Sequence, residues 1–202
     1  MNKRSFLGTV SSGAGSANFG STDDVIIGKN AAIRNLNPGS NIYIGKESAS
    51  SLQAGTENVF LGVRSGFSFQ NSTLNVILGS YSGLSKISGN ANVFLGAYSG
   101  SSNIIGNYNT FLGYRSGERT DGNENTFIGA ISDNYKTTSK KSIETVTCGY
   151  NAAPLLSGDS NVIIGNNAAE RVNQGNNNCI IGNNSAVKAS NLNSCILIGK
   201  NA

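Results

Sequence analysis

One short motif recurs along the whole chain: three mostly apolar residues followed by a glycine. Neighbouring glycines of this motif are 16 to 20 residues apart, and most often 17. A period of this length is typical of proteins in which each repeat adds one unit to an elongated stack. The repeat therefore limits the fold more than any other feature. The glycines are Gly8, Gly28, Gly45, Gly62, Gly79, Gly96, Gly113, Gly129, Gly149, Gly165, Gly182 and Gly199.

The residues before each glycine predict a short β-strand. If the glycine is position 0, position −3 is mostly β-branched and position −1 is mostly Leu or Ile, as in Val59 and Leu61. Side chains two residues apart share one face of a strand, and three-residue strands are not stable alone. We therefore expect a parallel ladder with positions −3 and −1 facing a narrow core. Small residues at position +3, such as Ser65, and glycine at position 0 fit close turns.

This pattern predicts an all-β chain, a parallel β-solenoid of about twelve coils, each 16 to 20 residues long. Residues 1–202 then form a single repeat domain. Residues 1–20 are either an irregular lead-in or the first coil, and residues 130–149 form a longer coil with a protruding loop.

Asparagine recurs at position −4, as in Asn58 and Asn92. Two interpretations remain open from the sequence. In-register side chains about 4.8 Å apart can form a ladder of amide hydrogen bonds along the stack. Alternatively, asparagine begins each strand because it tolerates the geometry of a turn.

Position −2 is also apolar. Because side chains alternate along a strand, position −2 faces outward if positions −3 and −1 face inward. An apolar column of this length exceeds what a monomer usually exposes, so we expect a parallel homotrimer with this column at its interface. Alternatively, the second half of each coil covers the column. The predicted interface residues are Phe6, Ile26, Tyr43, Phe60, Ile77, Phe94, Phe111, Phe127, Ile163, Ile180 and Leu197.

The unit N-V-F-L-G-x-x-S-G, present at residues 58–66 and 92–100, resembles the head repeats of trimeric autotransporter adhesins and the related repeats of phage tail fibres and other viral fibres. The resemblance extends over all twelve units. It implies a left-handed β-roll, three of which join into a parallel rod with a surface, fibre or adhesive role. Position −2 is bulkier here than the small residue expected in the adhesin heads.

The sequence shows no heptad stalk, barrel anchor or signal peptide, which a complete autotransporter needs. We therefore expect a non-enzymatic segment of a virion or phage tail fibre that is made in the host cytoplasm. Such a segment spaces, and is a candidate to bind, a host-surface receptor. The alternative is the head of a trimeric adhesin on a bacterial cell surface.

Composition argues against most other functions. The chain has no histidine, eleven dispersed acidic residues and a net charge of only +4. Histidine is the commonest general base and metal ligand, and an acyltransferase of the hexapeptide-repeat type would need one. An ice-binding solenoid would need a regular threonine column. We expect no enzyme, no cofactor or metal, no nucleic-acid partner and no membrane insertion.

We also expect Cys148 and Cys179, which replace aliphatic residues, to be buried free thiols.

Two features are candidates for binding a receptor, either a glycan or a protein of the host surface. Position +2 holds Arg64, Tyr81, Tyr98 and Arg115 in four consecutive coils, and such side chains suit sugars and anions. Packing between coils is the competing interpretation. The second candidate is the loop of the longer coil, which contains Tyr135 and Lys136.

Overall fold

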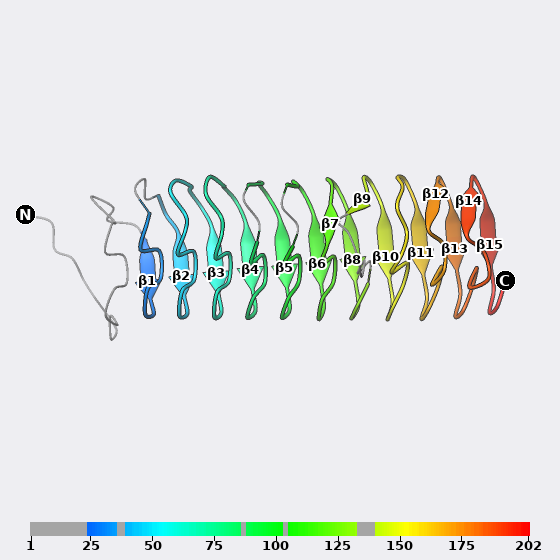
Figure 1. Cartoon of the computed structure of the whole chain (residues 1–202), viewed down its shortest axis with the longest axis horizontal. Coiled ribbons are helices and arrows are strands. Elements are labelled where there is room, and N and C mark those ends of the chain that lie inside the picture. Colours follow the sequence, from blue (N-terminus) through cyan, green and yellow to red (C-terminus); the bar gives the residue numbers. More distant parts are fainter. Residues whose placement is uncertain (1–23, 36–38, 86–87, 103–104, 133–139) are drawn as a thin grey trace, which may run out of the picture.

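The computed structural model describes residues 24–35, 39–85, 88–102, 105–132 and 140–202, and over these residues the chain is an all-β rod without helices (Figure 1). Eleven strands form one ladder along the rod. They are β1 (Val25–Ile27), β2 (Ile42–Ile44), β3 (Val59–Leu61), β4 (Val76–Leu78), β5 (Val93–Leu95), β6 (Thr110–Leu112), β8 (Thr126–Ile128), β10 (Val146–Cys148), β11 (Val162–Ile164), β13 (Cys179–Ile181) and β15 (Ile196–Ile198).

Every pair of neighbours in this ladder is parallel and aligns the same repeat positions. Between β5 and β6, for example, Phe94 lies opposite Phe111 and Leu95 lies opposite Leu112. The predicted parallel β-solenoid is therefore confirmed, with eleven strands described against about twelve predicted coils. The repeat that ends at Gly8 and the whole of the predicted lead-in, residues 1–20, lie outside the described residues.

A second, less regular ladder runs through the other half of each coil. It contains two short strand pairs, β7 (Thr120–Asp121) with β9 (Lys140–Lys141) and β12 (Gln174–Asn176) with β14 (Asn191–Asn193). Isolated bridges continue it from Ala54 to Ile105. The longer coil over residues 130–149 thus pairs with its neighbour through β9, while residues 133–139 lie outside the described part.

The prediction that position −2 faces outward is wrong, because this column fills the interior of the coil. The side chains with no exposed surface are Tyr43, Phe60, Ile77, Phe94, Phe111, Phe127, Ile163 and Ile180. Ile26 and Leu197 are half-buried and pack against the same core, and Phe6 lies outside the described residues. These side chains hold each coil together instead of forming an interface. Positions −3 and −1 face outward.

Strand alternation places position −2 opposite positions −3 and −1, but it does not decide which side is inside. Small side chains across the coil make room for the large ones at position −2. Position +3 is serine or alanine and is fully buried from Ala31 to Ser185, and Ser99, for example, donates a hydrogen bond to the carbonyl of Phe111 (3.1 Å). Thr147, the polar residue at position −2, is buried as well and shares a hydrogen bond of 2.5 Å with Ser132.

In several coils the residue at position +4 complements the size of position −2, although Tyr43 is combined with Ala49 and Ile77 with Gly83. A Cβ atom at Gly100 or Gly117 would come within 2.5 Å of the ring of Phe94 or Phe111. Where position −2 holds isoleucine in the C-terminal coils, position +4 holds alanine, as in the pair Ile163 and Ala169. The space that glycine leaves lets the rings of Phe94, Phe111 and Phe127 stack, with 4.8 Å between neighbouring centroids.

We expect Gly100→Ala to lower the free energy of unfolding by about 1–3 kcal/mol, since its methyl group would overpack the ring of Phe94. The double variant Phe94→Ile with Gly100→Ala copies the pairing of the C-terminal coils and should recover much of the loss. Urea unfolding of the parent, both single variants and the double variant measures the coupling. Additive losses in the double variant would show that these two positions do not share space.

The asparagines at position −4 form the amide ladder. From Asn41 to Asn125, each side-chain oxygen accepts two hydrogen bonds where the next coil also holds asparagine, one from its backbone amide and one from its side chain, as between Asn58 and Asn41 (2.9 and 3.1 Å). Thr145 interrupts the ladder, which resumes between Asn161 and Asn178. The side-chain nitrogen of Asn58 also donates to the carbonyl of Ser72 in the other half of the stack (2.8 Å). The ladder therefore joins the two layers of the rod as well as successive coils.

Candidate functional site

The outward side chains of the long ladder form a continuous apolar face along the rod. Each strand contributes its residues at positions −3 and −1, for example Val93 and Leu95 from β5. The described part of this sheet face contains no charged residue, and its only departures from aliphatic side chains are Thr110, Thr126, Cys148 and Cys179. Exposure is 42% at Leu112 within the rod and reaches 76% at Ile196 in the last strand. Monomeric proteins rarely leave an apolar patch of this extent in contact with water.

Two cysteines belong to this sheet face. Cys148 occupies position −1 of β10 and Cys179 occupies position −3 of β13, and both are free and half-exposed. The prediction that they are buried thiols is therefore wrong, because positions −1 and −3 face outward. Cys195 is also a free thiol of intermediate exposure.

The predicted +2 column does line up along the rod. Tyr81 and Tyr98 stack face to face at 5.1 Å, and the guanidinium of Arg115 lies 5.6 Å from the ring centre of Tyr98. Tyr114 meets the ring of Tyr98 edge-on at 6.2 Å. The ring faces are thus partly covered by neighbouring coils, which favours a role in packing between coils over stacking on a sugar.

Arg64, at the N-terminal end of the same column, is paired. Its Nε donates a hydrogen bond of 2.5 Å to Glu47, and its guanidinium also lies 5.4 Å from the ring centre of Phe67. This hydrogen bond lowers the pKa of the Glu47 carboxyl and raises the pKa of Arg64. Inside the coil, burial raises the pKa of the Tyr43 hydroxyl.

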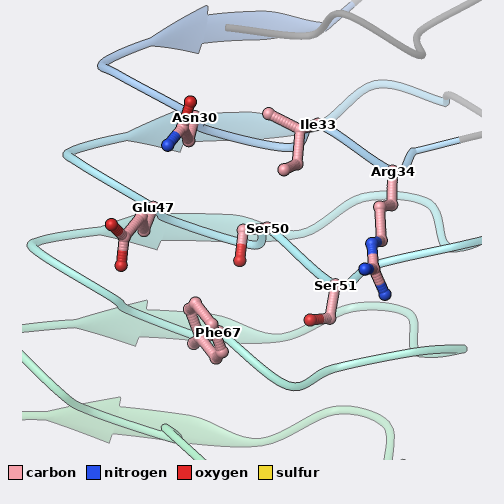
Figure 2. Close-up of a pocket in the computed structure, with 7 residues that line it drawn as sticks. All are labelled: Asn30, Ile33, Arg34, Glu47, Ser50, Ser51 and Phe67. Carbon is pink, nitrogen blue, oxygen red and sulfur yellow. The ribbon is translucent and has the colours of Figure 1, made fainter. Parts of the chain in front are cut away.

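Next to this pair lies an open surface pocket of about 460 Å³ (Figure 2). It spans three successive coils and is lined by Asn30, Ile33, Arg34, Glu47, Ser50, Ser51 and Phe67. These residues occupy positions +2, +5 and +6 of the repeat. Figure 2 shows the strands behind them, so the pocket does not involve the sheet face. The repeat pattern does not predict this site, because no single repeat contains all of its residues.

The other candidate receptor residues, Tyr135 and Lys136, lie outside the described residues. Over the part of the chain that the structure covers, no three His, Cys, Asp or Glu side chains group in a way that could hold a metal ion. In the same part, no helix is long and apolar enough to span a membrane.

No family model matches the chain, and no curated protein and no solved structure is significantly similar to it.

Proposed function

We propose that this chain is a non-enzymatic segment of a virion or phage tail fibre, and that it assembles as a parallel homotrimer that spaces a host-surface receptor from the particle. The observation that carries the proposal is the uncharged sheet face along the described length of the rod. The resemblance of the N-V-F-L-G-x-x-S-G units to fibre repeats supplies the biological context.

The sheet face supports self-association because it is uniform. Ten steps of about 4.8 Å give a face about 48 Å long, and every coil presents the same kind of side chain. A second copy aligned in parallel therefore meets an aliphatic row at every height. The two columns differ, with mostly β-branched residues at position −3 and mostly Leu or Ile at position −1. In a three-fold arrangement, the two columns of one chain would lie against two different neighbouring chains. Three chains joined in this way form a closed assembly.

We expect Leu95→Asp to dissociate the trimer, because it would bury one carboxylate in each of the three apolar seams. Burying an unpaired charge costs several kcal/mol. Sedimentation equilibrium should give three chain masses for the parent and one for the variant. Ser85→Asp is the matched control, since Ser85 is exposed at position +6, away from the sheet face. A parent that sediments as one or two chains would contradict the trimer.

Cys148 gives a separate measure of orientation and register. In a variant with Cys179→Ser and Cys195→Ser, the remaining thiols of parallel, in-register chains would lie at one height. Mild oxidation should then produce disulfide-linked dimers on a denaturing gel, with one chain of each trimer left unlinked. Because β10 is not central in the ladder, antiparallel packing would separate these thiols and give no such band.

A further inference from the structure

We infer that the pocket between Arg34 and Phe67 is a binding site for an acidic saccharide. The inference deepens the proposed attachment role and depends on that role for its biological meaning. The pocket itself is complete within one chain, because all its lining residues come from three consecutive coils. It also avoids the residues of the sheet face, so a trimer closed by that face would leave the pocket accessible.

The charges in the pocket favour an anion. Arg34 is exposed and forms no ion pair with any described residue, whereas Glu47, the one acidic residue in the lining, is paired with Arg64 at 2.5 Å and lies 3.8 Å from Lys46. The negative charge is thus compensated and the positive charge of Arg34 is not. A guanidinium presents a planar set of donors that suits a carboxylate or sulfate group.

The rest of the lining favours a sugar over a bare anion. The hydroxyls of Ser50 and Ser51 have no hydrogen-bond partner among the described residues, so both can bond to sugar hydroxyls. In Figure 2, Arg34 extends toward Ser51, and the ring of Phe67 lies below Ser50. An aromatic ring beside hydroxyl groups can pack against the apolar side of a pyranose. A pocket of about 460 Å³ is also large for an inorganic ion and lies in the usual range for small-molecule sites.

Arg34 differs from the residues at the same repeat position in the four coils that follow it. Those coils hold Ser51, Ser68, Ser85 and Ser102 at position +6, and basic residues return there in Arg119, Arg171 and Lys188. Arg171 is exposed and outside the pocket. The pair Arg34 and Arg171 therefore separates the effect of this pocket from the effect of a positive charge at position +6.

Saturation-transfer difference NMR on the full chain tests the inference. The acidic probes are N-acetylneuraminic acid, glucuronic acid and N-acetylglucosamine 6-sulfate, and N-acetylglucosamine is the neutral probe. Each is used at about 5 mM, which detects dissociation constants into the millimolar range. We expect transfer to at least one acidic sugar and little to the neutral one, and the sulfated probe distinguishes a sulfate from a carboxylate ligand. Arg34→Gln should weaken this binding about tenfold, whereas Arg171→Gln should leave it unchanged.

Three results would each overturn the inference: no transfer to any acidic probe, equal transfer to N-acetylglucosamine, or an equal loss in the two arginine variants. Sedimentation of the same samples reports the oligomeric state separately. A monomer that binds the acidic sugar would contradict the trimeric fibre and leave the pocket assignment intact. A trimer that binds none of the probes would contradict the pocket assignment and leave the trimeric fibre intact.

Discussion

Gly96→Ala is expected to prevent the rod from folding, or to lower its free energy of unfolding by more than about 4 kcal/mol. A Cβ atom at Gly96 would lie 2.5 Å from the carbonyl oxygen of Gly113 and 2.7 Å from its carbonyl carbon. Both contacts are with backbone, which cannot move without separating the coils. The φ angle of +132° is also one that L side chains rarely adopt.

Gly199→Ala is the matched control for this substitution. Gly199 has nearly the same φ angle, +134°, but the nearest atom that its Cβ would meet is 3.9 Å away, on Ala202. It should therefore incur only the backbone strain, about 1–3 kcal/mol. Circular dichroism during thermal and urea unfolding measures both variants. Equal losses would mean that backbone strain, and not the approach of the next coil, requires glycine at position 0.

Asn92→Ala is expected to lower the free energy of unfolding by about 3–5 kcal/mol, because several buried groups would lose their partners at once. The Asn92 side-chain oxygen accepts from the backbone and side-chain nitrogens of Asn109, each at 3.1 Å. Its side-chain nitrogen donates to the side chain of Asn75 (3.0 Å) and to the carbonyl of Gly106 (2.9 Å). No water can replace these contacts inside the stack.

Asn90→Ala provides the comparison two residues away. The side-chain oxygen of Asn90 accepts from the backbone amide of Thr73 at 2.9 Å, but Asn90 is exposed, so water can take its place. A loss below about 1 kcal/mol is expected. Asn92→Asp adds a pH test, since burial would raise the pKa of the new carboxyl. Its destabilisation should be smaller near pH 4 than at pH 7. If Asn90→Ala and Asn92→Ala lower the free energy of unfolding equally, the buried asparagine ladder does not stabilise the rod to the expected extent.

The period and the register of the ladder could be predicted from the sequence because they depend on local features. A glycine every 16 to 20 residues, with β-branched residues before it, defines both the strand and its corner. The orientation of the strand could not be predicted in the same way. All three strand positions are apolar, so hydrophobic alternation, which usually distinguishes the two faces of a strand, is missing.

A second pattern in part of the sequence contained a partial signal of the orientation. Glycine at position +4 accompanies phenylalanine at position −2 in the coils of Phe60, Phe94 and Phe111, and alanine accompanies isoleucine in those of Ile163 and Ile180. The coils of Tyr43 and Ile77 depart from it. Matched sizes at two positions indicate that the two side chains share one interior. The pocket had no comparable pattern, because Arg34, Ser51 and Phe67 come from three different coils and do not recur together along the repeat.

The register of about 17 residues per coil also determines how the rod would respond to mechanical load. Successive strands of the ladder are connected covalently by one coil of chain. A force along the axis would therefore detach one coil at a time from an end. Each release would extend the chain by roughly 50–55 Å, the contour length of 17 residues less one spacing of about 4.8 Å. A rod of this kind would therefore lengthen in small steps of similar size and dissipate a pull gradually, where a globular domain unfolds in a single event.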